Sequence, residues 1–297
     1  MKKYFLIIAV FSFVISLMAC SNSQESVESQ LVPKSETKNG SKAIDEIVPT
    51  KIIEYKNING ISLSLHVFNP EDHKNSDNRP AIVFFHGGGW NGGAPSHFYR
   101  QSQYLANKGM VAISAQYRVN KQHGTSPIES VKDAKSAIRW VRTHAQELGV
   151  NPDMIAAGGG SAGGHIAAAT GTATSFQEEG EDTSISYRPD ALVLFNPVFD
   201  NSPTGYGYDR VKAYWQQISP LHNITKDTPP MIGFFGELDT AIKLPAVYQF
   251  KQQMQQVGAS FELHVYDKQP HGFFNQAKYA ETVLAMHNFL KKRGFIQ

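Results

Sequence analysis

Short, uninterrupted hydrophobic runs recur along the chain, and amphipathic stretches separate most of them. Runs of this kind, without polar alternation, are typical of parallel strands that are covered on both faces. They predict a series of buried strands that begins about one quarter of the way along the sequence. We expect these strands at 81–85, 110–115, 154–157, 191–195, 231–235 and 261–266.

Two earlier stretches have a different pattern, because polar and hydrophobic residues alternate in them. Residues 51–56 and 61–68 are separated by Asn59-Gly60, a pair that favours the tight turn of a β-hairpin. The alternation in 61–68 is typical of a strand at a sheet edge, where one face meets solvent. We therefore expect a hairpin at one edge of the sheet.

The clearest helix signal begins at Ser126-Pro127-Ile128-Glu129. Serine suits the N-cap, proline suits the first helical position, and glutamate at the third position completes a capping box. Hydrophobic residues then recur at helical spacing as far as Leu148, and Gly149 is expected to end the helix. Further helices are expected after the glycine-rich stretch near residue 160, at 244–257 and at 276–292.

Strands that alternate with helices predict an α/β fold, with a mostly parallel central sheet and helices on both faces. Residues 51–297 are expected to form a single domain without internal repeats. The stretch 197–229 is long for a connection, so we expect it to contain a helix and part of a pocket. Four aromatic residues in it, Tyr206, Tyr208, Tyr214 and Trp215, either stack on a sugar or aromatic acyl group or cover the core.

A candidate nucleophile lies between a buried strand and a helix rich in small residues. Gly159-x-Ser161-x-Gly163 fits the Gly-x-Ser-x-Gly nucleophile elbow, a tight turn that exposes a serine hydroxyl above the sheet. Glycines meet the steric demand of such a turn, and the N-terminus of the following helix favours developing negative charge. The alternative interpretation is a flexible glycine-rich loop. The strand before and the helix after the motif favour the elbow.

A serine nucleophile needs a base, and the base needs a carboxylate to fix its tautomer. His271 follows the last predicted strand in a Pro-His-Gly loop, and Asp239 follows the strand before it. The order serine, acid, histidine is the one expected of this fold. Glu237 in the same loop and the more distant Asp200 are rival acids. The other histidines are interpreted as structural: His165 on the nucleophile helix, His264 within a strand and His287 in the terminal helix.

The glycine-rich segment His86-Gly87-Gly88-Gly89-Trp90 follows the strand at 81–85. Segments of this type supply backbone N–H groups to an oxyanion hole, because glycine lets the backbone approach the substrate closely. We expect Gly87 and Gly88 to act together with the N–H of Ala162, with Gly89 as a further possibility. His86 is expected to brace the loop rather than to react.

These motifs resemble those of α/β-hydrolase esterases marked by His-Gly-Gly-Gly-Trp and Gly-Gly-Ser-Ala-Gly-Gly. Residues from about 50 to 297 are similar to hormone-sensitive-lipase-like and feruloyl- or acetyl-xylan-esterase-like bacterial carboxylesterases. Gln116-Tyr117-Arg118 departs from the Asp-Tyr-Arg of that family at its first position. The resemblance implies hydrolysis of carboxylic esters, through Ser161, His271 and Asp239, without a metal or an organic cofactor.

The substrate class is less sharply indicated. We expect the substrate to be a small-molecule or carbohydrate ester, with either a short-chain acyl group or a carbohydrate-linked ester bond. The sequence contains no long apolar lid of the kind that a lipase would need. Three alternatives stay open: an arylformamidase, a serine peptidase of the same fold, and a non-catalytic binding lipoprotein. The sequence contains neither a His-Glu-x-x-His motif nor clustered metal ligands, so we expect no metal site. It does not indicate an oligomeric state.

The N-terminal segment predicts export. Residues 1–19 combine Lys2-Lys3 with an apolar run, as in a secretory signal, and Leu17-Met18-Ala19-Cys20 resembles the lipobox of bacterial lipoproteins. Cys20 would then be lipidated, and the polar residues 20–50 would form a flexible tether on the cell envelope. An ordinary signal peptide is the alternative. Cys20 is the only cysteine, and the formal net charge of +2 without a basic run argues against nucleic acid binding.

Overall fold

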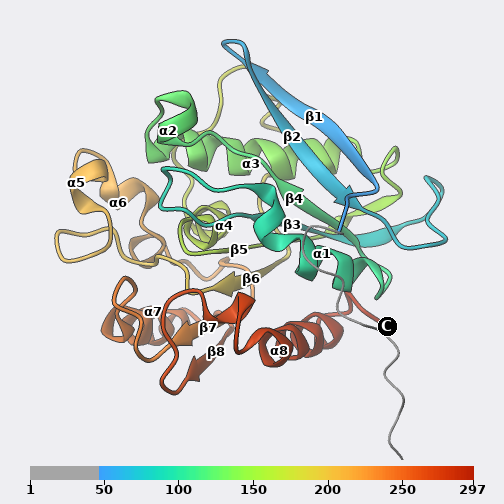
Figure 1. Cartoon of the computed structure of the whole chain (residues 1–297). Helices are drawn as coiled ribbons and strands as arrows, with labels where there is room; N and C mark the ends of the chain where they lie inside the picture. The colour runs from blue at the N-terminus through green and yellow to red at the C-terminus, as the bar shows by residue number, and fades with distance from the viewer. Residues whose placement is uncertain (1–46) are drawn as a thin grey trace, which may run out of the picture. The chain divides into compact units, whose positions relative to one another are not determined.

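One sheet forms the centre of the computed structural model, which describes residues 47–297 (Figure 1). Its strand order is β1-β2-β4-β3-β5-β6-β7-β8. β2 is antiparallel to both of its neighbours, and every other pairing in the sheet is parallel. The strands are β1 (Lys51–Ile58), β2 (Ile61–Phe68), β3 (Arg79–Phe85), β4 (Val111–Ala115), β5 (Val150–Gly160), β6 (Ala191–Phe195), β7 (Met231–Gly236) and β8 (Phe261–Tyr266). The predicted α/β fold with a mostly parallel sheet is confirmed.

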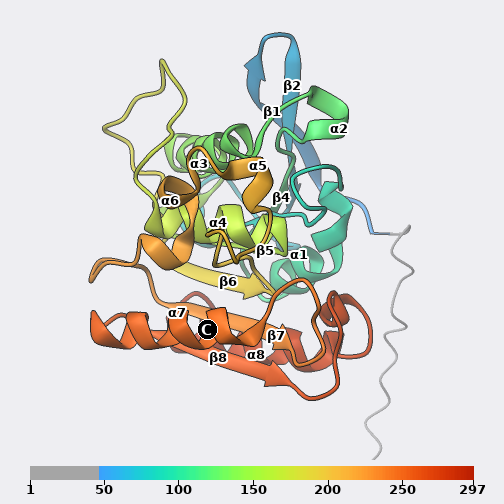
Figure 2. The same ribbon diagram turned by 90° about the vertical axis from the view of Figure 1, so that its left-hand side faces the viewer.

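Helices cover both faces of this sheet (Figures 1 and 2). One face packs against α3 (Pro127–Thr143), α4 (Ala162–Thr172) and α7 (Leu244–Gln256). The other face packs against α1 (Tyr99–Ala106) and α8 (Tyr279–Lys292). The shorter helices are α2 (Asn120–His123), α5 (Tyr208–Val211), α6 (Trp215–Ile218), η2 (Pro95–Phe98), η3 (Pro220–His222) and η4 (Phe273–Asn275).

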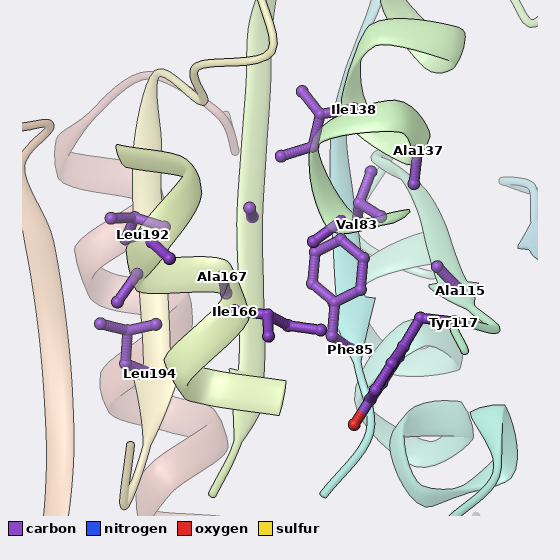
Figure 3. Close-up of a cluster of buried hydrophobic side chains, with 14 of the residues drawn as sticks. Val83, Phe85, Ala115, Tyr117, Ala137, Ile138, Ile166, Ala167, Leu192 and Leu194 are labelled. Atoms are coloured by element: carbon purple, nitrogen blue, oxygen red, sulfur yellow. The ribbon is translucent and has the colours of Figure 1, made fainter. Parts of the chain in front are cut away.

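Successive residues of the central strands serve opposite faces, which explains their uninterrupted hydrophobic runs. In β3, Val83 and Phe85 belong to the cluster beneath α3 and α4, whereas Ile82 and Phe84 belong to the cluster beneath α1 and α8. Figure 3 shows the first cluster, in which Ile166 of α4 extends toward Phe85 and the Phe85 ring points toward Val83. Each large apolar side chain that is buried in this way contributes about 2–3 kcal/mol to folding.

Two edge predictions need correction. The alternating strand β2 lies one position inside the sheet, and β1 forms the edge. The hairpin turn at Asn59-Gly60 is confirmed, since both residues have positive φ. β8, which we expected to be buried, forms the opposite edge, and its Val265 is 39% exposed. The hydrophobic residues Phe261 and Leu263 of β8 pack against the core, but no strand pairs with the outer edge of β8 in the described sheet.

The capping box that begins α3 is confirmed by reciprocal bonds between Ser126 and Glu129. The helix ends at Thr143, five residues before the predicted end at Leu148. Hydrophobic spacing continues beyond it because the following turn still buries Ala145 and Leu148. Gly149 then reverses the chain with a φ of +62°, as expected of a residue that follows a helix or turn.

The segment 197–229 contains the short helices α5, α6 and η3, and the sequence analysis expected a helix in it. Val211, Ile218 and Leu221 are buried and anchor it to the core. Tyr214 and Trp215 pack against the same cluster, which fits a covering role for these two rings. None of the helices in residues 47–297 is long and apolar enough to cross a bilayer.

The predicted signal peptide (1–19), the lipidation site Cys20 and most of the tether (20–50) lie outside the described residues. The last residues of that predicted tether are described. Ile47 packs against the core, and the Thr50 N–H donates to the Val67 carbonyl at 2.7 Å. The division into signal, tether and catalytic domain stays a prediction.

Candidate active site

Ser161 occupies the turn between the end of β5 and the start of α4. Its φ of +55° and ψ of −121° are unusual for a residue with a side chain, and such strain costs on the order of 1–3 kcal/mol. The turn is held by two backbone bonds of 2.9 Å, from Ser161 N–H to the Phe195 carbonyl and from His165 N–H to the Ser161 carbonyl. Gly163 is required here, because a Cβ would lie 2.1 Å from the Phe85 carbonyl oxygen. The sequence predicts this strand-turn-helix arrangement correctly.

The structure brings Ser161, His271 and Asp239 into one hydrogen-bonded chain. His271 Nε2 lies 3.0 Å from Ser161 Oγ, and His271 Nδ1 lies 2.6 Å from Asp239 Oδ2. The Asp239 side chain is fully buried. Its other oxygen accepts the N–H groups of Ala241 and Ile242 at 2.8 and 2.9 Å. Since the carboxylate only accepts hydrogen bonds, Nδ1 of the imidazole bears the proton and Nε2 faces Ser161 with a free lone pair.

The rival carboxylates lie elsewhere. Glu237 is exposed, and its carboxylate accepts the Lys268 N–H at 3.0 Å. Asp200 accepts both the N–H and the hydroxyl of Ser202. Neither side chain has a hydrogen bond to His271 in the part of the chain that the structure describes.

The predicted oxyanion segment faces Ser161. Gly87, Gly88 and Gly89 line a pocket of about 460 Å³ together with Ser161 and His271. Within residues 47–297, no backbone carbonyl accepts a hydrogen bond from the N–H groups of these glycines. Ala162 is the first residue of α4, so its N–H also has no partner within the helix. Gly88 has a φ of +125°, and a Cβ there would lie 2.1 Å from the Gly92 carbonyl oxygen.

His86 holds the start of the glycine segment in place. Its ring stacks on Tyr117 with a centroid distance of 4.2 Å, and its Nδ1–H donates to the Gly87 carbonyl at 2.9 Å. The Tyr117 hydroxyl donates to the His86 carbonyl at 2.7 Å. Burial disfavours the charged imidazolium and lowers the pKa of His86 to about 4. This neutral, fixed ring fits the expected bracing role.

The three other histidines that the sequence analysis interpreted as structural make structural contacts. His165 is fully buried, its Nε2–H donates to the Ile218 carbonyl at 3.1 Å, and its ring lies edge-on to Trp90. Burial lowers the pKa of His165 to about 4. His264 contacts Glu262 on the same strand, and His287 packs near Tyr104 on α1.

Mild acid is expected to destabilise the protein through His86 and His165. An ordinary histidine pKa of 6.5 applies after unfolding, whereas the folded values are about 4. The unfolded chain therefore binds more protons between these values, so the stabilisation is complete above pH 6.5 and is lost as the pH falls toward 4. Each residue should contribute about 2 kcal/mol to the loss between neutral pH and pH ~5. Urea unfolding of the wild type and of His165→Gln at both pH values measures this; an equal pH slope in the two proteins would contradict it.

Asn196 is a site residue that the sequence analysis missed. It follows β6 directly, it is fully buried, and its φ is +37°. Its Nδ2 lies 3.2 Å from His271 Nε2, the same atom that faces Ser161. The only signal in the sequence is an Asn-Pro pair at the end of a buried strand. Asparagine tolerates positive φ, so this pair also suits an ordinary turn.

Two aromatic rings that the sequence analysis did not single out form the apolar part of the pocket. Phe98 and Phe274 stack with a centroid distance of 5.9 Å and line the pocket beside Ser161. A Cβ on Gly160 would lie 2.8 Å from Phe274 and 3.3 Å from Phe98. Their positions depend on η2 and η4, which no hydrophobic periodicity predicts.

Gln116, which replaces the acid of the related motif, is hydrogen-bonded to β1 and β2. Its Oε1 accepts the Ser64 hydroxyl at 3.1 Å, and its carbonyl accepts the Tyr55 hydroxyl at 2.8 Å. Arg118, two residues on, forms a buried pair with Asp133. Among the described residues, no group of three or more His, Cys, Asp or Glu side chains is placed to hold a metal ion.

Comparison with known proteins identifies the family. The family model BD-FAE matches residues 65–204. A solved structure of Thermogutta terrifontis esterase 2, phosphoramylated by tabun, is 40% identical and superposes with a TM-score of 0.81 over 84% of this chain and 97% of that chain. The chain belongs to the carboxylesterases of the α/β-hydrolase fold. The apo form of the same esterase matches this α/β-hydrolase equally well, at 39% identity and a TM-score of 0.81.

More distant carboxylesterases match over part of their length. Esterase LipC of Mycobacterium tuberculosis is 27% identical over 205 residues, which are 61% of this chain and 49% of LipC. The probable carboxylic ester hydrolase LipM of the same organism is 29% identical over 238 residues, or 71% of this chain and 54% of LipM. This α/β-hydrolase carboxylesterase thus spans about half the length of the curated relatives it matches.

Proposed function

We propose that this α/β-hydrolase hydrolyses short-chain acyl esters through a Ser161-His271-Asp239 triad and an acyl-enzyme. The supporting observation is the continuous chain of contacts at 3.0 and 2.6 Å that links the three side chains. The glycine segment lines the pocket that also contains Ser161, Ala162 directly follows Ser161 at the start of α4, and the family membership agrees with ester hydrolysis.

In the proposed reaction, Ser161 Oγ attacks the ester carbonyl carbon while its proton passes to His271 Nε2. Asp239 stabilises the imidazolium through Nδ1–H. N–H groups of Gly87, Gly88 and Ala162 bind the oxyanion, and each is worth on the order of 3 kcal/mol in the transition state. The Nε2 proton then passes to the leaving alcohol oxygen as the ester C–O bond breaks. Water, activated by Nε2, releases the acid and restores Ser161.

The two rings beside Ser161 favour a short acyl group. Phe98 and Phe274 close the pocket against Gly160, so an extended alkyl chain has little room on that side. Solved structures of Thermogutta terrifontis esterase 2 contain bound propionate and bound butyrate. By analogy, we expect acetyl to butyryl esters to be the preferred substrates of this chain.

Replacing Phe274 with alanine is expected to shift the acyl preference toward longer chains. Removal of the ring opens space next to Gly160, so kcat/KM for nitrophenyl octanoate should rise relative to nitrophenyl acetate by about tenfold. Phe289→Ala is the matched control, because Phe289 is also buried in the cluster beneath α8 but lies outside the pocket lining. Equal changes in both variants would count against the assigned acyl site.

A second pocket has room for a bulky or carbohydrate alcohol group of the ester substrate. It measures about 350 Å³, and it shares Tyr206 and Ala241 with the pocket at Ser161. Its lining combines the apolar Phe199 with the polar Thr204 and Lys243. A sugar hydroxyl esterified with a short acid could therefore place its ring beyond Tyr206, with the ester carbonyl at Ser161.

A substrate panel tests this function and separates it from its alternatives. The full-length protein should hydrolyse nitrophenyl acetate and acetylated xylo-oligosaccharides, and it should be inactivated by paraoxon. Preferential cleavage of an N-formyl aromatic amine would indicate an arylformamidase, and preferential cleavage of a peptide amide would indicate a peptidase. Absence of turnover together with absence of paraoxon labelling would indicate a binding protein.

We further propose that the chain is exported and anchored to the cell envelope through Cys20. The support is the sequence Leu17-Met18-Ala19-Cys20 after an apolar run. Metabolic labelling with a palmitate analogue should mark the wild type and leave Cys20→Ser unmarked. Equal labelling of both, or of neither, would refute the anchor.

A further inference from the structure

We infer that Asn196 is a positioning residue for His271 and that it holds the imidazole while Ser161 is acylated. The inference rests on the proposed acyl-enzyme mechanism. Within it, Asn196 would matter more for deacylation than for acylation.

The geometry gives His271 Nε2 two neighbours. Ser161 Oγ lies 3.0 Å away and Asn196 Nδ2 lies 3.2 Å away. The backbone of Asn196 is fixed, because its N–H donates to the Phe234 carbonyl at 2.7 Å and the preceding carbonyl, of Phe195, accepts the Ser161 N–H at 2.9 Å. These backbone bonds fix the position from which the Asn196 side chain extends, relative to both β7 and the turn that contains Ser161.

The hydrogen-bond donors available to His271 Nε2 change when Ser161 is acylated, and this change makes Asn196 important. In the free enzyme, the Nε2 lone pair can accept from either the Ser161 hydroxyl or the Asn196 amide N–H. In the acyl-enzyme, Ser161 Oγ is bonded to the acyl carbon and has no proton to donate. Among residues 47–297, Asn196 is then the side-chain donor that remains within hydrogen-bond distance of Nε2. The His271 side chain is 34% exposed, so a lost contact on this side leaves it room to move.

The same side chain can also accept from the imidazolium. Asn196 Oδ1 is buried and has no hydrogen-bond partner among residues 47–297. A half turn of the amide exchanges Oδ1 and Nδ2 without changing the shape of the side chain. In that orientation Oδ1 accepts a hydrogen bond from Nε2–H of the imidazolium, whose proton comes from Ser161 in acylation and from water in deacylation. The proton leaves again to the alcohol oxygen in the first half-reaction and to Ser161 Oγ in the second.

Two variants remove this amide while keeping the backbone conformation. Glycine and aspartate both tolerate positive φ, so Asn196→Gly and Asn196→Asp should fold. The measurement is the pre-steady-state burst of nitrophenol from nitrophenyl acetate by the full chain. For Asn196→Gly we expect a burst amplitude per folded chain at least equal to that of the wild type, with acylation changed by less than about threefold and deacylation slowed by at least about tenfold.

Asn196→Asp supplies a readout that a structural role would not affect. A carboxylate accepts from protonated Nε2 but donates nothing to neutral Nε2, so the acid limb of the kcat/KM profile should move to higher pH. The other titratable groups around the ring are Asp239 on Nδ1 and His97 in the pocket lining, and both are unchanged in the variant. Asn201→Asp is the matched control, because Asn201 is buried in the same segment and contacts the Tyr206 carbonyl instead of His271.

Three outcomes would overturn the inference. Both half-reactions of Asn196→Gly could slow equally, both could stay at wild-type rates with only the burst amplitude reduced, or the Asn196→Asp profile could match that of Asn201→Asp. A wild-type protein that gives no burst and no paraoxon adduct would instead refute the acyl-enzyme mechanism itself, and the role of Asn196 with it.

Discussion

Replacing Ser161 with alanine is expected to lower kcat for nitrophenyl acetate by at least about four orders of magnitude. The hydroxyl lies 3.0 Å from His271 Nε2, and alanine leaves neither a nucleophile nor a proton to transfer. Alanine adopts the same strained φ as serine with a smaller side chain, so the free energy of unfolding should change by less than about 1 kcal/mol. Steady-state kinetics and urea unfolding of the purified variant measure both effects.

The carboxylate partner offers an internal control for this prediction. Asp239→Asn should reduce kcat by about three to four orders of magnitude, because an amide that donates to Nδ1 favours the wrong tautomer of His271. Glu237→Gln, in the same loop but with its side chain bonded to the Lys268 N–H, should stay within about threefold of the wild type. The reverse ranking of the two variants would show that the acid is misassigned.

Replacing Asp133 with asparagine is expected to destabilise the fold by about 3–5 kcal/mol. The Asp133 carboxylate is fully buried, and it accepts the Nε and Nη2 groups of Arg118 at 2.8 and 2.7 Å and the Lys56 ammonium at 2.7 Å. A neutral amide leaves these cations without adequate compensation in a poorly hydrated site. Glu178, which bonds both cations at 2.7 Å, is only partly able to replace the missing charge.

The same substitution should also disturb the glycine segment at the active site. Arg118 follows Tyr117, whose hydroxyl bonds the carbonyl of His86 immediately before the glycine segment. Denaturant unfolding gives the stability change, and Asp72→Asn, which alters an exposed carboxylate, is the control. A loss of less than about 1 kcal/mol for Asp133→Asn would show that the buried network is not important for stability.

Local pattern was sufficient for most of the sheet and for selecting three side chains that the structure brings into one hydrogen-bonded chain. Buried parallel strands have uninterrupted hydrophobic runs, and in this fold the side chains of interest follow such runs directly, as His271 and Asp239 do. The capping box at Ser126 was equally explicit, because it depends only on neighbouring residues. These features are encoded within a few positions of where they occur.

Features that depend on tertiary contacts were not predictable in the same way. α1 has little hydrophobic signal, and its buried residues include the polar Gln101 and Ser102. The turn after α3 buries the same positions that a continued helix would bury, so spacing alone overextends that helix. Asn196 was missed because its contact with His271 joins loops 75 residues apart. Which glycine N–H groups would face an oxyanion in the proposed mechanism depends on backbone conformation, which identical residues at 87–89 do not reveal.

Covalent labelling of the full-length protein tests the central claim most directly. Paraoxon should transfer its phosphoryl group to a single residue, and peptide mass spectrometry should locate the adduct on Ser161, with labelling greatly slowed in His271→Ala. An adduct on another residue, or full esterase activity in a protein that paraoxon does not modify, would contradict the account.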